Sequence, residues 1–215
     1  TKDGKSEVRN ISREVMGNIQ SMGLDALIVI GGDGTLKIAY ELFKLGCPVV
    51  GVPKTIDNDI LATDVTFGFH TAVQTATDAL DRLHTTAESH HRVMVVEVMG
   101  RNVGWIALET GIGGGADVIL IPEIPFDIEK VGQKIMDRKK SGSRSSIVVV
   151  SEGAKPMGGD VTVLRCGEAG GSAERLGGIG DKVGENINCY GMEVRVTVLG
   201  HLQRGGSPCA FDRIL

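Results

Sequence analysis

The sequence predicts an α/β protein made of two Rossmann-like three-layer units with mostly parallel sheets, the first of them incomplete. Three observations support this fold class. Short apolar runs alternate with amphipathic segments along most of the chain, as in repeated strand–helix–strand units. The apolar runs are continuous, which is typical of parallel strands covered on both faces. Glycine is frequent, with 31 residues, and many glycines stand where a predicted strand should end.

The first predicted unit begins with a helix over residues 6–22, where apolar residues recur at helical spacing. Residues 26–30 form a continuous apolar run and are predicted to be a strand. The glycine-rich segment Gly31–Thr35 ends this strand, and a short helix follows to about Leu45. Residues 49–52 are the next predicted strand.

The second predicted unit opens with the clearest helix, residues 69–88, whose apolar residues fall on one side. The same alternation then repeats. Predicted strands cover residues 92–98, 118–121, 146–150 and 194–199, and predicted helices cover residues 102–112, 128–140 and 172–188. Residues 153–171 are rich in glycine and small side chains, so we expect a surface excursion there.

Composition and charge argue against several functional classes. The net charge of −4 argues against general binding to nucleic acid or to an anionic membrane. No apolar run approaches the roughly 18 residues of a membrane span, and the N-terminus shows no signal-peptide pattern. The four cysteines are scattered and lack paired zinc spacing. We therefore expect a protein of the reducing cytoplasm.

The fold class itself indicates where a site should lie. Open parallel sheets bind ligands at the carboxyl ends of their strands. The segments selected by this rule are residues 31–35, 53–59, 97–101, 151–155 and 199–206. They are also the densest runs of glycine, charge and proline in the chain, so we expect them to form the binding site.

The segment Gly31–Thr35 stands between a strand and a helix. Free amides at a helix N-terminus attract anions, so this loop is predicted to bind phosphate. Asp33 is then well placed to hold Mg²⁺, which prefers oxygen ligands. The alternative is a glycine-rich turn in which Asp33 only caps the helix.

Two other segments imitate known nucleotide-binding motifs. Lys54 and Thr55 resemble the end of a P-loop, but Pro53 stands where a glycine should precede the lysine. Residues 111–116 resemble a dinucleotide fingerprint, but they follow a helix and precede a strand, which is the wrong order. We interpret residues 111–116 as a helix stop.

Two aspartates follow the second predicted strand. Asp57 and Asp59 are two residues apart, so in an extended chain both side chains point to the same face. One carboxylate there could accept a proton from a sugar hydroxyl and the other could bind a metal. Thr55 shares that face and could orient a phosphoryl group. The alternative is a turn in which these side chains satisfy their own backbone.

Four motifs in this order resemble 6-phosphofructokinase. They are Gly-Gly-Asp-Gly-Thr (31–35), Pro-Lys-Thr-Ile-Asp-Asn-Asp (53–59), Glu-Val-Met-Gly-Arg (97–101) and Gly-His-Leu-Gln-Arg-Gly-Gly-Ser-Pro (200–208). A motif similar to the first also occurs in NAD kinases and diacylglycerol kinases, whereas the other three together are specific. The resemblance spans nearly the whole chain, with residues 153–190 poorly matched.

The resemblance implies transfer of a phosphoryl group to the 1-hydroxyl of fructose 6-phosphate. Asp57 is similar to the family's general base, and Thr55 to the residue that contacts the transferring phosphoryl group. Asp33, with help from Asp59, is expected to hold Mg²⁺. Arg101 is expected to steady the charge that builds on the phosphoryl oxygens.

The resemblance also implies a sugar-phosphate site. Residues expected to line the sugar pocket are Met99, Gly100 and Glu152, and those expected to bind the 6-phosphate are Arg92, Arg195, His201 and Arg204. In the family, the arginines matching Arg92 and Arg195 come from a neighbouring subunit, which implies a homo-oligomer, a dimer or a tetramer. Taken singly, each of these residues also has an ordinary structural explanation.

The phosphoryl donor in this family is either ATP or pyrophosphate. The donor site is expected to include Gly32, Asp33, Gly34, Thr35 and Lys54. Pyrophosphate users generally have aspartate at position 34 with lysine at position 54. The pair Gly34 and Lys54 is found among some ATP users, and glycine leaves room for the α-phosphate, so we favour ATP.

The resemblance divides the chain into three parts. Residues 1–68 are expected to belong to the donor-binding domain, residues 69–200 to the fructose 6-phosphate domain, and residues 201–215 to the return segment. The family's N-terminal glycine-rich phosphate loop is absent from this sequence, so we expect a central fragment that is inactive alone. Two alternatives remain: a related kinase acting on NAD or lipid, and a non-catalytic sugar-phosphate-binding subunit.

Overall fold

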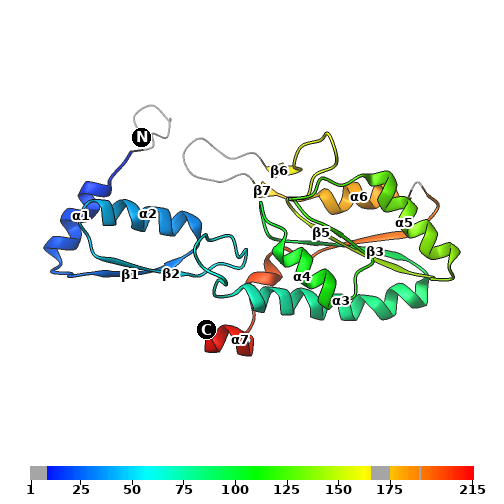
Figure 1. Cartoon of the computed structure of the whole chain (residues 1–215), viewed down its shortest axis with the longest axis horizontal. Coiled ribbons are helices and arrows are strands. Elements are labelled where there is room, and N and C mark those ends of the chain that lie inside the picture. The colour runs from blue at the N-terminus through cyan, green and yellow to red at the C-terminus, as the bar shows by residue number, and fades with distance from the viewer. Residues whose placement is uncertain (1–8, 166–174, 189) are drawn as a thin grey trace.

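Two parallel sheets form the frame of the molecule, one with two strands and one with four (Figure 1). The structure is a computed structural model that describes residues 9–165, 175–188 and 190–215. All strand pairs within these two sheets are parallel, so the expected fold class is confirmed. A short antiparallel hairpin forms a third, separate sheet.

The first sheet pairs β1 (Leu27–Gly31) with β2 (Val49–Pro53). Helices α1 (Ser12–Ser21) and α2 (Asp33–Lys44) both lie on one side of it (Figure 1). The small core between these helices and the sheet is centred on three buried residues, Ile19, Leu42 and Cys47. This unit therefore has two layers.

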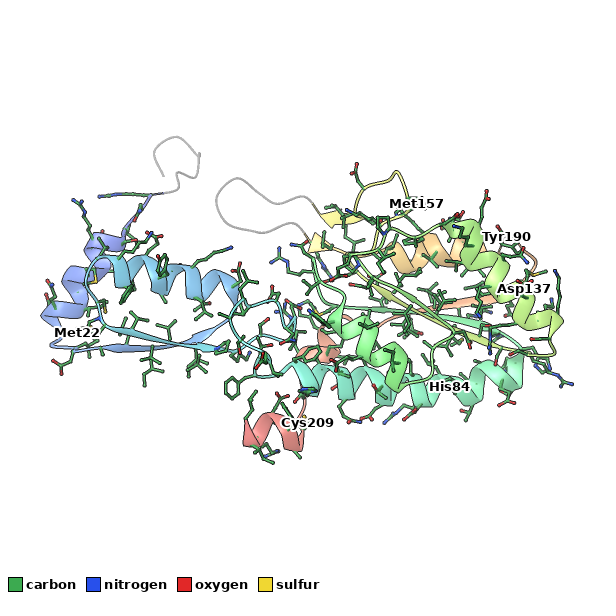
Figure 2. All side chains as sticks on the ribbon, viewed as in Figure 1. Met22, His84, Asp137, Met157, Tyr190 and Cys209 are labelled. Atoms are coloured by element: carbon green, nitrogen blue, oxygen red, sulfur yellow. The ribbon has the colours of Figure 1, made fainter. Side chains whose placement is uncertain are left out.

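The other face of the first sheet is uncovered within the described residues. Ile28, Ile30 and Val50 are all more than half exposed. Figure 2 shows side chains of the two strands projecting on the side away from α1 and α2. The predicted incompleteness of the first unit corresponds to this bare face.

The second sheet has the strand order β4-β5-β3-β8. Its strands are β3 (Val93–Val98), β4 (Val118–Leu120), β5 (Ser146–Ser151) and β8 (Val194–Val198). Every residue of the central strands β3 and β5 is buried. This explains why these strands read as continuous apolar runs in the sequence.

Helices cover both faces of the second sheet (Figure 1). One core packs α3 (Phe69–His90) and α4 (Trp105–Gly113) on one face. A second core packs α5 (Ile128–Lys140) and α6 (Ile179–Asn188) on the other. The second unit is therefore the three-layer arrangement predicted from the sequence.

The last described segment returns toward the start of α3. The 3₁₀-helix η1 (Gly200–Arg204) follows β8, and α7 (Ala210–Ile214) ends the chain beside the first turn of α3 (Figure 1). The Asp212 carboxylate accepts hydrogen bonds from the backbone N–H of Gly68, at 2.9 Å, and of Thr71, at 2.8 Å. The Thr71 hydroxyl also donates to Asp212.

Several predicted elements have different bounds in the structure. The first helix starts at Ser12, because residues 9–11 are not helical and residues 6–8 lie outside the described part. The predicted helix 172–188 is wrong at its start, since α6 begins only at Ile179. Arg175–Leu176 is instead a strand, β7, paired with β6 (Val163–Arg165).

Other local predictions are confirmed. Helix α4 ends at Gly113, so residues 111–116 are the predicted helix stop and not a nucleotide loop. Strand β6 lies inside the predicted surface excursion 153–171, of which residues 166–171 are not described.

The helices are too short or too polar to span a bilayer: among the described residues, none combines the length and the apolar character needed to cross a membrane. Cys47 and Cys209 are free, and the other two cysteines lie outside the described residues.

Candidate active site

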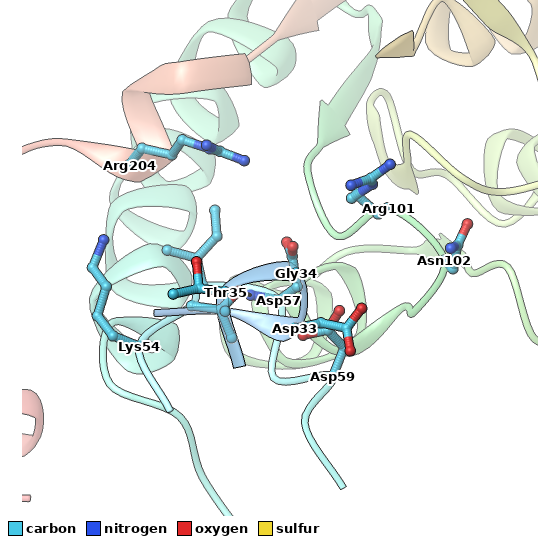
Figure 3. Close-up of a pocket in the computed structure, with 12 residues that line it drawn as sticks. Asp33, Gly34, Thr35, Lys54, Asp57, Asp59, Arg101, Asn102 and Arg204 are labelled. Atoms are coloured by element: carbon cyan, nitrogen blue, oxygen red, sulfur yellow. Dashed lines mark hydrogen bonds between the residues drawn. The ribbon is translucent and has the colours of Figure 1, made fainter. Parts of the chain in front are cut away.

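A cavity of about 510 Å³ opens where the carboxyl ends of the two sheets face each other. We call it cavity 1. Its lining residues are Gly32, Asp33, Gly34, Thr35, Lys54, Thr55, Ile56, Asp57, Asp59, Arg101, Asn102 and Arg204. Figure 3 shows the three aspartates grouped together, with Arg101 and Arg204 approaching from other parts of the chain. Four of the five segments selected by the strand-end rule thus meet in cavity 1, and residues 151–155 are the exception.

The glycine loop presents the start of a helix to cavity 1. Helix α2 begins at Asp33 directly after β1, and Gly32 is its N-terminal cap residue in extended conformation. No side chain caps this end, so its first backbone N–H groups are available to an anion. Asp33 forms an exposed ion pair with Lys37 at 2.7 Å. The alternative role of Asp33 as the helix cap is therefore wrong, because the cap residue is Gly32.

The loop after β2 is fixed to β1 and to itself. The Lys54 N–H donates to the Gly31 carbonyl at 2.9 Å, which places this loop beside the glycine loop. The Thr55 hydroxyl accepts a hydrogen bond from the Asp57 N–H at 3.2 Å. The Thr66 hydroxyl donates to the Thr55 carbonyl at 2.8 Å.

The two aspartates of this loop do not lie on one extended strand, so that expectation is wrong. Asn58 between them has φ 53°, a left-handed conformation that reverses the chain direction. The Asn58 side-chain oxygen accepts from the Thr66 N–H at 2.9 Å, which holds the turn. Asp57 is consequently buried and Asp59 exposed, yet both still line cavity 1.

Asp57 is the buried carboxylate among the three aspartates that line cavity 1. It is only 6% exposed, and within the described part of the chain its Oδ1 atom has no hydrogen-bond partner. Burial, reinforced by the negative charge of Asp59, raises the pKa of Asp57 above its ordinary value. The positive charges of Arg204 and Arg101 act in the opposite direction.

Arg101 is held by its backbone in a rare conformation. Its φ of 48° is left-handed, and it follows Gly100, whose φ is 138°. The Arg101 N–H donates to Glu152 Oε1 at 3.1 Å. Its carbonyl packs against Gly153, where any Cβ atom would collide with it. The ends of β3 and β5 thus fix the position from which the guanidinium reaches cavity 1.

A second cavity of about 300 Å³, cavity 2, shares Arg101 and Arg204 with cavity 1. Its lining residues are Glu97, Met99, Arg101, Glu152, Leu164, Arg175, Leu176, Val198, Gly200, His201 and Arg204. The predicted residues Met99, Glu152, His201 and Arg204 are therefore brought together. Burial raises the pKa of Glu152, although the hydrogen bond from the Arg101 backbone opposes this.

Arg92 and Arg195 line neither cavity. Arg92 directly precedes β3, and Arg195 pairs with Met94 near the start of that strand, so both lie at the amino-terminal edge of the sheet. Glu193 forms ion pairs with Arg92 at 2.8 Å and with Arg195 at 2.7 Å. The hydrogen bond from Arg92 lowers the pKa of Glu193. Within this chain these two arginines do not join the other predicted site residues.

Sequence reasoning did not identify several residues of the two cavities. Asn102 and Ile56 directly adjoin predicted residues in the chain, so their positions could have been anticipated. Arg175 and Leu176 lie in no recognisable motif and reach cavity 2 only through the β6–β7 hairpin. The glycine pair Gly177-Gly178 follows them in the sequence, and both glycines have positive φ. This pair is the signal that could have drawn attention to the segment.

The carboxylates available for a metal ion in cavity 1 are those of Asp33, Asp57 and Asp59. Across the described ranges, no group of three or more His, Cys, Asp or Glu side chains is arranged to hold a metal ion by itself. Mg²⁺ usually takes only one or two carboxylates and completes its shell with phosphate oxygens and water. The residues of cavity 1 therefore fit Mg²⁺ that is bound together with a phosphorylated ligand.

Comparisons with known proteins cover the whole chain. The sequence model of the family described as phosphofructokinase matches residues 1–215. ATP-dependent 6-phosphofructokinase of Chloroflexus aurantiacus is 64% identical over 198 residues, which are 92% of this chain and 54% of that protein. Pyrophosphate–fructose 6-phosphate 1-phosphotransferase of Streptomyces coelicolor is 54% identical over 205 residues, 94% of this chain and 60% of that protein.

The fold is also similar to solved structures. Phosphofructokinase from Saccharomyces cerevisiae superposes with a TM-score of 0.77 at 32% identity, over 100% of this chain and 31% of that chain. The chain spans about half the length of the curated relatives that it matches.

Proposed function

The chain belongs to the phosphofructokinase family, and from this we propose that the full-length protein transfers a phosphoryl group from ATP to the 1-hydroxyl of fructose 6-phosphate. The product is fructose 1,6-bisphosphate. The proposal depends above all on one observation, the meeting of Asp33, Asp57 and Arg101 in cavity 1. Cavity 2 adjoins this group and supplies the cationic residues that a sugar phosphate requires.

Asp57 acts as the general base. Its unpartnered Oδ1 atom is free to accept the proton of the sugar 1-hydroxyl. Its environment raises the pKa, which makes the carboxylate a stronger base than an exposed aspartate. Thr55 orients the transferring phosphoryl group, since its hydroxyl lies at the same cavity and already accepts from the Asp57 N–H.

The donor phosphates bind at the glycine loop. The uncapped N-terminus of α2 and the side chains of Thr35 and Lys54 favour negative charge at this end of cavity 1. Asp33 and Asp59 would hold Mg²⁺, which would neutralise charge on the donor phosphates. Asp33 is exposed and paired only with the exposed Lys37, so its carboxylate would be accessible to the cation.

Arg101 stabilises the negative charge that spreads over the phosphoryl oxygens during transfer. Its guanidinium lines both cavities, so it lies between the donor and the acceptor. In cavity 2, Met99 and Glu152 position the sugar, and His201 and Arg204 bind its 6-phosphate. Gly100 does not line the cavity itself but stands in the chain between the lining residues Met99 and Arg101. Arg92 and Arg195 serve the same phosphate in a neighbouring subunit, and their position at the amino-terminal ends of the strands, away from this chain's own cavities, is compatible with this.

Pyrophosphate is the second candidate donor. The Streptomyces relative is named for pyrophosphate and is about as similar to this chain as several relatives named for ATP. We favour ATP because Gly34 leaves space at the glycine loop: a Cβ atom there would have no atom within 4 Å. A non-catalytic subunit is disfavoured, because all three aspartates of cavity 1 are retained.

Three further assignments belong to the same proposal. Residues 1–68 contribute to donor binding, residues 69–200 bind fructose 6-phosphate, and residues 201–215 return to the first part. The protein is a homo-oligomer, a dimer or a tetramer. It works in the cytoplasm.

The experiment is a steady-state assay of the full-length protein with fructose 6-phosphate, Mg²⁺ and either ATP or pyrophosphate. We expect ATP to support the higher kcat/KM. Asp57→Asn should lower kcat by about 10²–10⁴-fold, because the base is lost. Asp64→Asn is the matched control, an exposed aspartate of the same loop that lines neither cavity. Full activity of Asp57→Asn would refute the proposed mechanism, and absence of turnover in the wild type would refute the function.

A further inference from the structure

The β6–β7 hairpin contributes a side of cavity 2 for which no function has been assigned. Leu164 of β6 and Arg175 and Leu176 of β7 line this cavity. The hairpin lies outside the four motifs quoted from the sequence. Its residues line the same cavity as His201 and Arg204, which the proposed function assigns to the sugar phosphate.

A buried carboxylate fixes the end of this hairpin. Glu97 lies within β3 and is only 3% exposed. Its carboxylate accepts hydrogen bonds from the Gly178 N–H at 3.1 Å and from the Gly180 N–H at 2.7 Å. Both donors stand around the first turn of α6, where backbone N–H groups lack partners within the helix.

Glycines make this close approach possible. Gly177 and Gly178 have φ values of 134° and 83°, which other residues rarely adopt. A Cβ at Gly177 would lie 3.0 Å from Glu97 Oε1, and a Cβ at Gly180 would lie 3.0 Å from Glu97 Oε2. The chain after Arg175 is thus held on the buried Glu97, and this fixes the hairpin beside cavity 2.

The charges of cavity 2 indicate what Arg175 can bind. The Glu97 carboxylate is already engaged by backbone N–H groups, which leaves Glu152 as the other acidic residue of the lining. Arg101, Arg175, His201 and Arg204 supply the cationic or potentially cationic groups. Arg175 is exposed, and within residues 9–165, 175–188 and 190–215 its guanidinium forms no ion pair.

We propose that Arg175 is a further substrate-binding residue, whose guanidinium binds the phosphate monoester of the sugar, and that Glu97 is the residue that positions it. This inference rests on the proposed function, because it concerns the same acceptor site. An arginine fork donates two hydrogen bonds to a phosphate and is well suited to an open-sided cavity. Arg175 comes from the same chain as His201 and Arg204, so it needs no neighbouring subunit.

The test combines binding and kinetics of the full-length protein. In Arg175→Ala, the Kd for fructose 6-phosphate, measured calorimetrically without donor, should rise about tenfold, as expected when one charged hydrogen-bonding partner is lost. The KM for fructose 6-phosphate should rise by a similar factor, while kcat and the KM for ATP stay within about twofold of wild type. Arg175→Lys should recover part of the affinity, since it keeps the charge but loses the fork.

Glu97→Gln tests the positioning role. The glutamine amide has one oxygen that accepts and one NH₂ group that donates, whereas Gly178 and Gly180 both present N–H donors. One of the hydrogen bonds that hold the end of the hairpin is therefore lost or weakened. Its Kd for fructose 6-phosphate should also rise. Adding Arg175→Ala to Glu97→Gln should then change the Kd by less than Arg175→Ala does alone, because the two residues act through one contact.

Lys182→Ala is the matched control. Lys182 is an exposed cation on α6, close to the hairpin in sequence, and it lines neither cavity. We expect its Kd and KM to equal those of wild type, and thermal unfolding checks that each variant is folded.

Three results would overturn the inference. These are an unchanged Kd in a folded Arg175→Ala variant, a rise in the KM for ATP instead, and an equal effect of Lys182→Ala. A wild-type protein that binds no fructose 6-phosphate would overturn the proposed function itself, so the two failures are distinguishable.

Discussion

The backbone carbonyl of Arg101 rests on the Cα atom of Gly153, in the space that a side chain at position 153 would occupy. This contact joins the segment after β3 to the segment after β5. Glu152 reinforces it by accepting the Arg101 N–H. The position of the Arg101 guanidinium therefore depends on a glycine that itself lines neither cavity.

We predict that Gly153→Ala lowers kcat by on the order of 10²-fold, the loss expected when a catalytic group moves by about 1 Å. The new methyl group must displace the Arg101 backbone, because the atom it would collide with most closely is the main-chain carbonyl oxygen of Arg101. Steady-state kinetics of the full-length protein measure this. Gly17→Ala is the control, since a Cβ at Gly17 meets no atom within 4 Å. A wild-type kcat in Gly153→Ala would show that Arg101 does not need this contact.

Asn58 is predicted to be required for the geometry of Asp57. It combines a φ of 53° with a hydrogen bond to the Thr66 N–H. Asn58→Gly still tolerates the left-handed conformation but loses the side-chain hydrogen bond. Asn58→Ala loses the hydrogen bond and also disfavours the left-handed conformation. We expect kcat to fall in both variants and to fall further in Asn58→Ala. The reverse order in kinetic assays would mean that the backbone conformation is not the important factor.

The choice of donor is predicted to depend on position 34. Gly34 lines cavity 1, and a Cβ atom placed there meets no atom within 4 Å, so we expect Gly34→Asp to leave the fold intact. The added carboxylate should repel the nucleotide phosphates and raise the KM for ATP by about tenfold or more, as for an unfavourable charge near a bound anion. Gly34→Ala separates size from charge and should have the smaller effect. Faster turnover with pyrophosphate than with ATP in the wild type would contradict our preference.

Asp212 is predicted to make stability depend on pH. Partial burial raises its pKa, but hydrogen bonds from Thr71 and Gly68 outweigh this and lower it overall. A group whose pKa is lower in the folded state stabilises the protein above its unfolded pKa, and the stabilisation is lost as the pH falls through the folded pKa. Asp212→Asn should therefore cost about 1 kcal/mol near neutral pH, the usual value of a helix cap.

Thermal unfolding of wild type and Asp212→Asn between neutral and acidic pH measures this difference. The gap between the two Tm values should shrink as the pH is lowered, because protonation removes the advantage of the carboxylate. A gap that stays constant with pH would show that the charge of Asp212 contributes nothing.

Much of the fold is readable from local sequence. The bounds of α5 match the prediction for residues 128–140, because helical periodicity coincides there with the cap residue Asp127, whose side chain accepts from the Glu129 N–H. Strands β3 and β5 are rich in apolar residues because they are central in the sheet and buried on both faces. In these elements local preference and tertiary environment agree.

The sequence-based predictions were wrong where contacts between residues distant in the sequence determine the structure. The start of α6 was misplaced because Arg175–Leu176 pairs with β6, a contact that no local pattern announces. Asp57 and Asp59 were expected on one face because nothing in their spacing shows that Asn58 is left-handed. Arg175 was missed for a similar reason, since it reaches cavity 2 through its strand pairing in the β6–β7 hairpin. Which residues share a cavity depends on such three-dimensional contacts more than on motifs.

The two sheets also have a mechanical consequence. Asp33 and Asp57 follow the two strands of the two-stranded sheet, whereas Arg101 follows a strand of the four-stranded sheet. The separation between the Asp57 carboxylate and the Arg101 guanidinium therefore depends on how the two sheets are held relative to each other, and the contacts of Asp212 with Gly68 and Thr71 lie where the chain passes from one sheet to the other.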